Sequence, residues 1–131
     1  MTVFVDTSAL YALLDAADAQ HRPGRAAFTR LVHDQDLITH SYVLVETIAL
    51  AQRRLGPDAV RALTRELLPA VATVWVDEAA HAAGLAALIA AFPTEVSLVD
   101  QVSFHLMREL GLTRAFAFDR DFRTAGFEVL P

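Results

Sequence analysis

Two aspartates follow directly after short apolar segments that have the composition of buried β-strands. Asp6 comes after Val3-Phe4-Val5, and Asp119 comes after the Ala-Phe-Ala-Phe segment at 115–118. Short runs of β-branched and aromatic residues are typical of strands. Because parallel strands carry their ligand sites at their carboxyl ends, we expect both carboxylates to face the same crevice. We therefore expect Asp6 to lie in an acidic metal site, to which the rest of the chain brings further carboxylates.

Glu46 is a carboxylate in an otherwise apolar helical segment. Apolar residues surround it at 43–45 and 48–51, nearly all round the expected helix. A helix that is apolar on every face is normally buried, and a buried carboxylate is costly unless it is paired, protonated or metal-bound. Glu46 is thus a candidate metal ligand or catalytic group. The alternative is an ion pair with Arg53 or Arg54, although neither has the ideal helical spacing.

Asp100 and Asp121 are two further acidic candidates, each with a structural alternative. Asp100 lies near an expected helix start and is spaced from Ser97 as in a capping box, so by itself it is better explained as a cap than as a ligand. Asp121 follows Asp119 by two residues. It could assist the site, cap the last helical turn or pair with Arg123.

The combination of these carboxylates favours a hard divalent cation. Carboxylates gathered within a few ångströms resist joint ionisation, and a bound cation removes that penalty. Oxygen ligands, no cysteine and no paired histidine motif indicate Mg²⁺ or Mn²⁺ rather than zinc. Such ions activate water and stabilise the leaving oxygen in phosphodiester cleavage. Ser8 lacks the G-x-S-x-G surroundings of a hydrolase nucleophile, and the chain has no Gly-rich phosphate loop.

The composition indicates a folded protein. The 131 residues are 54% hydrophobic, and we expect one domain over residues 1–131. A net charge of −5 argues against nucleic-acid binding by charge alone, but not against an enzyme that meets phosphates through a metal ion. The sequence has no membrane-spanning run, no secretory signal and no cysteine, so we expect no membrane association and a cytoplasmic location.

Short strand-like segments alternate with longer helical ones. Strands are expected at 3–5, 37–38, 71–76, 115–118 and 127–130, and helices at 9–14, 20–32, 42–55, 57–68, 78–91 and 98–110. This alternation is the pattern of βαβ units. It predicts an α/β fold with a central parallel sheet of four to five short strands and helices on both faces.

Four motifs, in order over essentially the full length, resemble the PIN domain. They are Asp6-Thr7-Ser8-Ala9-Leu10, the isolated Glu46 after Ser-Tyr-Val-Leu, Val99-Asp100 near a helix start, and Phe118-Asp119-Arg120-Asp121-Phe122. More closely, the chain looks like a VapC-type toxin, the ribonuclease half of a bacterial toxin–antitoxin pair. The resemblance implies that Asp6, Glu46, Asp100 and Asp119 form an acidic Mg²⁺ or Mn²⁺ site.

The resemblance also implies supporting residues and partners. Ser8 would hold Asp6 or a metal-bound water by hydrogen bonding, Thr7 is a weaker candidate for that role, and Asp121 matches a position that is acidic in many members. A cognate small antitoxin protein and a homodimer are the implied protein partners.

Metal-dependent endonucleolytic cleavage of RNA is therefore the leading hypothesis. Arg120 and Arg123 could contact the RNA backbone, and solvated surface charge is their alternative. Two other functions stay open at this point: a PIN-like binding module without catalysis, and a phosphohydrolase acting on small phosphate esters.

Overall fold

The computed structural model describes residues 1–131 and contains one five-stranded parallel sheet with the strand order β3-β2-β1-β4-β5. The strands are β1 (Thr2–Val5), β2 (Asp36–His40), β3 (Ala72–Val74), β4 (Arg114–Phe116) and β5 (Glu128–Leu130). β1 is the central strand, and its Val3 and Val5 are fully buried. This position explains its continuous apolar run, because a strand covered on both faces needs no polar alternation. The predicted α/β class is confirmed.

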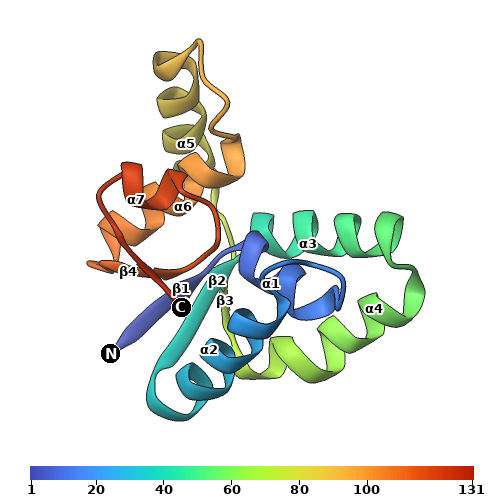
Figure 1. Ribbon diagram of the computed structural model, residues 1–131. Helices are drawn as coiled ribbons and strands as arrows, with labels where there is room; N and C mark the ends of the chain where they lie inside the picture. Colours follow the sequence, from blue (N-terminus) through green and yellow to red (C-terminus); the bar gives the residue numbers. More distant parts are fainter.

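Helices cover both faces of the sheet (Figure 1). They are α1 (Thr7–Leu14), α2 (His21–Asp34), α3 (Ser41–Arg54), α4 (Pro57–Ala62), α5 (Glu78–Ala91), α6 (Leu98–Glu109) and α7 (Asp121–Thr124). A π-helical turn (Leu63–Leu67) and a 3₁₀ turn (Leu68–Ala70) continue α4. Helices α1 to α4 gather on one side and α5 to α7 on the other, where α5 packs on α6 and projects from the body. None of these helices is both long and apolar enough to cross a bilayer.

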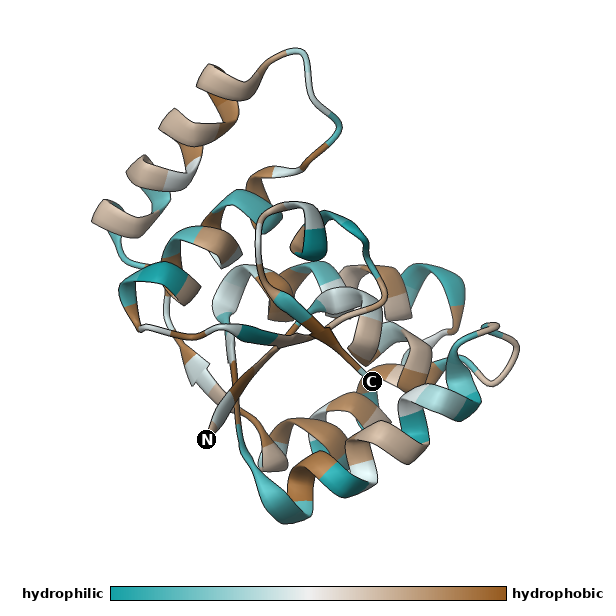
Figure 2. Cartoon of the chain, turned by 60° about the vertical axis from the view of Figure 1, so that its left-hand side comes forward, coloured by the Kyte–Doolittle hydropathy of each residue, from teal (hydrophilic) through white to brown (hydrophobic).

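The hydrophobic core lies between the sheet and its helices (Figure 2). It combines Phe4 of β1 and Phe116 of β4 with Leu10 of α1, Phe104 of α6 and Phe122 of α7. These residues belong to one cluster of eighteen buried residues, which joins α1 on one face of the central strands to α6 on the other. The first residues after β1 and β4 are therefore fixed between two packed helical layers.

The end of β4 differs from the prediction. The segment 115–118 was expected to be a strand, but the strand ends at Phe116. The reason is that the N–H of Phe118 donates to the Ser8 hydroxyl (2.9 Å), which draws the chain out of the ladder. Asp119 consequently lies on a short loop beyond the strand, and not directly at its end.

The environment of α3 also differs from the prediction. The helix was expected to be buried on every face, yet Val45 is 65% exposed and Ala49 is exposed too. Only one stripe, formed by Val43, Thr47 and Ala51 at helical spacing, is fully buried. Because the exposed face of α3 also carries short apolar side chains, the sequence of this helix resembles that of a buried helix.

Three consecutive buried polar residues, Thr39, His40 and Ser41, form the corner between β2 and α3. Each joins this β2–α3 corner to a different segment. The Thr39 hydroxyl donates to the carbonyl of Val5 in β1 (2.8 Å), and the Ser41 hydroxyl accepts from the N–H of Val76 beyond β3 (2.9 Å).

His40 is the central residue of the β2–α3 corner. Its Nδ1 accepts the N–H groups of Tyr42 and Val43 at the start of α3, and its Nε2 lies 2.7 Å from the Ser103 hydroxyl of α6. Burial lowers the pKa of His40 to about 4, so the ring is neutral near pH 7. A neutral ring that accepts at Nδ1 must donate from Nε2. Ser103 in turn donates to the carbonyl of Val99. One imidazole thus fixes α3, which carries Glu46, relative to α6, which carries Asp100.

We predict that His40→Ala lowers the free energy of unfolding by about 2–4 kcal/mol, because it leaves buried donors unpaired and opens a cavity. Urea denaturation measures this loss. His33→Ala is the matched control, because the His33 side chain is 88% exposed, and it should leave stability nearly unchanged. Equal stability of the two variants would contradict the role assigned to His40.

Candidate active site

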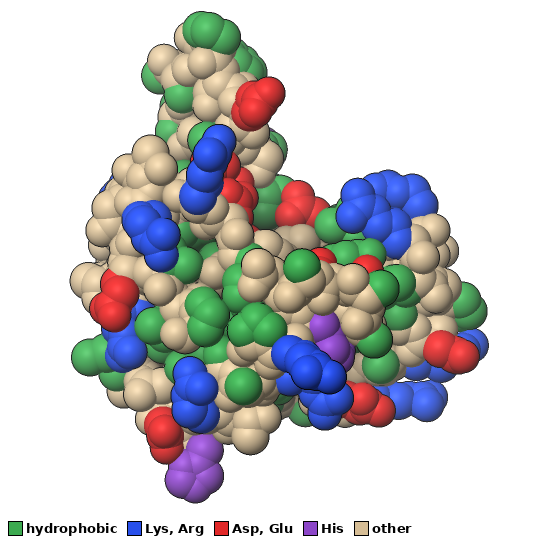
Figure 3. Space-filling model, viewed as in Figure 1, with side chains coloured by type: hydrophobic (Ala, Val, Ile, Leu, Met, Phe, Trp, Pro, Cys, Tyr) green, Lys and Arg blue, Asp and Glu red, His purple; other side chains and the backbone are tan.

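An acidic cleft of about 420 Å³ opens beyond the carboxyl ends of β1 and β4. Its thirteen lining residues are Asp6, Thr7, Ser8, Tyr11, Asp18, Gln20, Glu46, Leu50, Arg54, Ser97, Asp100, Phe118 and Asp119. In Figure 3 the acidic side chains lie in a notch between the lobe of α5 to α7 and the lobe of α3. The chain passes from β1 to β2 and β3 on one side of β1 and then crosses to β4 and β5 on the other side. The cleft therefore lies at the point where the strand order reverses, which is where open α/β sheets bind ligands.

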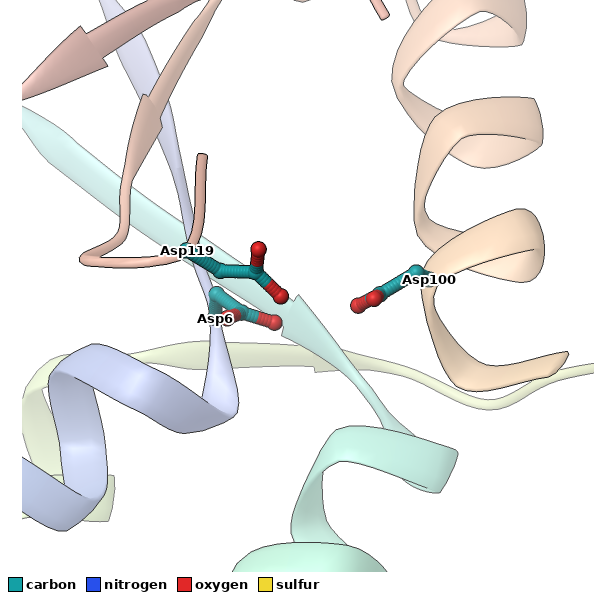
Figure 4. Close-up of side chains that lie close together, drawn as sticks. All are labelled: Asp6, Asp100 and Asp119. Atoms are coloured by element: carbon teal, nitrogen blue, oxygen red, sulfur yellow. The ribbon is translucent and has the colours of Figure 1, made fainter. Parts of the chain in front are cut away.

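Asp6, Asp100 and Asp119 form a close group within this cleft. One carboxylate oxygen from each lies within 4.8 Å of those of the other two. Figure 4 shows Asp6 and Asp119 side by side at the sheet edge and Asp100 pointing toward them from α6. Three elements far apart in the sequence therefore bring carboxylate oxygens to one point, and Asp6 and Asp119 face the same cleft, although Asp119 lies on a loop beyond β4.

Asp6 has one satisfied and one unsatisfied carboxylate oxygen. It is the N-cap of α1, and its Oδ2 accepts from the backbone N–H of Ser8 (3.1 Å) and from the Ser8 hydroxyl (2.7 Å). Its Oδ1 is buried and has no hydrogen-bond partner. Burial raises the pKa of Asp6 to about 6, although the hydrogen bonds from Ser8 act in the opposite direction. A buried acceptor without a partner is a place for a cation.

The Ser8 hydroxyl joins both strand ends of the site. It donates to Asp6 and accepts from the N–H of Phe118, which precedes Asp119. The prediction that Ser8 supports Asp6 by hydrogen bonding agrees with this geometry. The hydroxyl of Thr7 is buried and has no partner, so it offers a second unused oxygen beside Asp6.

Asp100 lies in the first turn of α6, but its side chain is not the cap. The Ser97 hydroxyl caps the helix by accepting from the N–H of Asp100 (3.1 Å), and the carboxylate of Asp100 makes no return bond to Ser97. The capping-box alternative is therefore only half correct. Burial, followed by the charges of Asp6, Asp119 and Glu46, raises the pKa of Asp100 to about 8.

Glu46 lies in the same cleft but outside the close group of three. It lines the cleft from α3 and is half-buried, and its charge contributes to the raised pKa of Asp100. No ion pair joins it to Arg53 or Arg54, which were the predicted alternative partners. The Glu46 carboxylate is therefore free to interact with groups inside the cleft, for example through a water molecule.

Asp119 also organises the segment that follows it. Its Oδ1 accepts the N–H of Asp121, the first residue of α7. Partial burial and the neighbouring Asp119 raise the pKa of Asp121. Asp121 makes no ion pair with Arg123, which was one of its predicted alternatives. It does not line the acidic cleft.

Arg120 and Arg123 lie beside the acidic cleft rather than in it. They line an adjacent hollow of about 170 Å³ that shares Phe118 and Asp119 with the cleft. The cleft lining also includes Tyr11, Asp18, Gln20 and Arg54, which were not predicted as site residues from the sequence. Arg54 lies over the Tyr11 ring, 5.6 Å from its centroid. Only the packing of α3 on α1 brings this pair together, so no local pattern in the sequence marks it.

The residues of the cleft fit a hard divalent cation. The three aspartates bring carboxylate oxygens to one point, and the Oδ1 of Asp6 lacks any other partner. Burial, and after it repulsion between the carboxylates, raises the pKa values of Asp6 and Asp100. A divalent ion removes this repulsion and satisfies the free oxygens. Asp6, Asp100 and Asp119 would hold such an ion.

We predict that Asp100→Asn changes the pH dependence of stability in the metal-free protein. The pKa of Asp100 is about 8 in the folded state against an ordinary 3.8, so its stabilising contribution is present at low pH and is lost as pH rises toward 8. Asp100→Asn has a neutral side chain at this position at every pH and does not lose this stabilising contribution. The variant should therefore be more stable than the parent by roughly 2 kcal/mol near pH 8.5.

The gain should shrink at about pH 5.5, where Asp100 is protonated in the folded parent. Urea denaturation in EDTA at the two pH values gives the comparison. A stability difference between the proteins that is the same at both pH values would contradict the pKa assigned to Asp100. Asp36→Asn, which alters an exposed aspartate at the start of β2, is the control.

Comparisons with known proteins agree with this fold and site. The PIN domain model matches residues 3–128. The chain is 38% identical, over 98% of both proteins, to the 23S rRNA-specific endonuclease VapC20 of two Mycobacterium tuberculosis strains. The crystal structure of VapC20, described as a sarcin–ricin loop cleaving toxin, superposes with a TM-score of 0.83 at 35% identity over 95% of each chain. FitAcB from Neisseria gonorrhoeae shares the fold alone, with a TM-score of 0.70 at 16% identity over 100% of this chain and 97% of that one. The chain therefore belongs to the PIN-domain family and, within it, to the VapC-type proteins.

Proposed function

We propose that this protein is a metal-dependent endoribonuclease and the toxin component of a toxin–antitoxin pair. The observation that carries the proposal is the convergence of Asp6, Asp100 and Asp119 within 4.8 Å, with an unpartnered buried oxygen on Asp6. Whole-chain identity of 38% to an rRNA-specific endonuclease supports the choice of RNA as substrate. Ribosomal RNA is accordingly the first substrate to test, and an RNA substrate also agrees with the expected cytoplasmic location.

Mg²⁺ or Mn²⁺ is the proposed cofactor, held by Asp6, Asp100 and Asp119. When bound, it would supply Lewis acidity toward water and the phosphodiester. The protein's own contribution is to hold these side chains in position. Ser8 fixes Asp6 and the Phe118–Asp119 segment, and the β2–α3 corner fixes Glu46 relative to Asp100. Glu46, half-buried at the cleft wall, would orient a water, and Arg120 and Arg123 would contact phosphates along the adjacent hollow.

We predict that Asp6→Asn lowers RNA cleavage by at least about 100-fold, because it removes a charged ligand while keeping the shape of the side chain. EDTA should abolish cleavage by the parent, and Mg²⁺ or Mn²⁺ should restore it. Cleavage of ribosomal RNA, followed by gel electrophoresis, provides the measurement. Asp34→Asn is the matched control, because the Asp34 side chain is 62% exposed and does not line the cleft.

The alternatives give different results in the same assay. A binding module would bind RNA but leave it intact at every metal concentration. A phosphohydrolase would turn over a small phosphate ester while leaving RNA intact. Equal cleavage by the parent, by Asp6→Asn and by the EDTA-treated protein would remove the metal-nuclease proposal.

We also propose a homodimer and a small antitoxin as protein partners. Large apolar side chains lie exposed on and beside the projecting α5: Trp75 is 74% exposed, Ile89 59% and Phe92 60%. Exposed apolar side chains of this size often mark protein–protein contacts. A second copy of the chain or a bound antitoxin would cover these side chains.

We expect the isolated chain to self-associate in a concentration-dependent manner. Sedimentation velocity over about a hundredfold range of protein concentration should show a shift from monomer to dimer. The boundary should not shift further at the upper end of the range, since a closed dimer has no free face left. A single monomer boundary throughout would contradict the homodimer.

A further inference from the structure

The acidic cleft has one basic lining residue, and that residue is a candidate for binding substrate. Of the thirteen residues that line the cleft, five are acidic and Arg54 alone is basic. Arg54 is the last residue of α3 and is exposed. It pairs with no carboxylate within 4.0 Å, although the cleft is rich in them. No carboxylate therefore occupies its guanidinium, which is open to an anionic ligand.

The aromatic ring of Tyr11 supports this guanidinium. Arg54 lies 5.6 Å above the ring centroid, at cation–π distance. The Tyr11 hydroxyl donates to Asp15 (3.0 Å), which fixes the ring at the end of α1. An arginine stacked on an anchored ring loses less side-chain freedom on binding a ligand than one that is free in solvent. The pair is thus a preorganised cation on the α1–α3 side of the cleft.

Arginines on the other side of the cleft complete the arrangement. Arg120 and Arg123 border the hollow that continues from Phe118 and Asp119. In Figure 3, basic side chains lie on both sides of the notch that holds the acidic ones, at the end of α3 and on the lobe of α5 to α7. A phosphate chain placed across the acidic group would meet positive charge on both flanks.

We propose that Arg54, held in place by Tyr11, binds a phosphate of the RNA next to the one that is cleaved, on the side of the cleft opposite Arg120 and Arg123. The inference rests on the proposed ribonuclease function. A phosphate is the group that fits an unpaired guanidinium, because the fork of N–H donors matches two of its oxygens. Arg54 is a substrate-binding residue in this proposal, and Tyr11 is a positioning residue that acts through it.

The principal test compares Arg54→Ala with Arg53→Ala in steady-state RNA cleavage. Arg53 is the neighbouring exposed arginine in the last turn of α3, and it does not line the cleft. Arg54→Ala should raise KM by about tenfold with little change in kcat and should reduce the salt dependence of binding by about one charge. Arg53→Ala should behave like the parent. Equal KM values and equal salt slopes for the two variants would overturn the proposal.

Two variants of Tyr11 separate positioning from folding. Tyr11→Phe keeps the ring under Arg54 but loses the hydroxyl that bonds to Asp15, so it should raise KM less than Tyr11→Leu does. Tyr11→Leu removes the ring and should raise KM toward that of Arg54→Ala. Urea denaturation of each variant shows whether it is folded. A raised KM in Tyr11→Phe equal to that in Tyr11→Leu would overturn the positioning role.

A binding measurement separates failure of this inference from failure of the proposed function. Fluorescence anisotropy with a labelled RNA, in the Asp6→Asn background without cleavage, should show weaker binding when Arg54→Ala is added. If the parent does not cleave RNA, the proposed function fails. If the parent cleaves and Arg54→Ala leaves both KM and anisotropy unchanged, only the assignment of Arg54 fails.

Discussion

The repulsion among buried carboxylates is the constraint on which this structure depends. Asp6 and Asp100 both have raised pKa values because burial disfavours their charged forms, and for Asp100 the neighbouring acids add to that effect. No basic side chain of the cleft neutralises the group, since Arg54 lies over Tyr11. The fold therefore holds a local arrangement that is unfavourable without a cation, and stability must come from elsewhere. The eighteen-residue hydrophobic core and the parallel sheet provide it.

Neutral hydrogen bonds, rather than ion pairs, hold the charged group in place. Ser8 ties the loop after β4 to the turn after β1, and His40 ties α3 to α6 through Ser103. Neutral bonds are suited to this task because they add no charge that would compete with a cation for the carboxylates. These hydrogen bonds also make the geometry of the site depend on buried contacts on both faces of the sheet.

The acidic residues could be predicted from the sequence to the extent that local pattern fixes their position. Asp6 and Asp119 follow short apolar segments, and a parallel sheet brings such positions to one edge. Glu46 lines the cleft from α3, but the prediction that this helix is buried on every face was wrong, because Val45 and Ala49 leave one face exposed. The end of β4 was misplaced because a side chain 110 positions away, that of Ser8, captures the N–H of Phe118. Arg54 and Tyr11 were missed for the same reason: their contact exists only in three dimensions.

The bond between Ser8 and Phe118 has a consequence for the newly made chain. Its two partners are separated by 110 positions, and Asp119 comes after the second of them. During synthesis the ribosome produces the turn that holds Asp6 early and completes the acidic group only after most of the polypeptide has emerged. Until then the central strand lacks β4 as a neighbour, and no set of three carboxylates exists to gather a cation. The acidic group of a protein whose activity would be directed at RNA is thus complete only when nearly all of its residues have been joined.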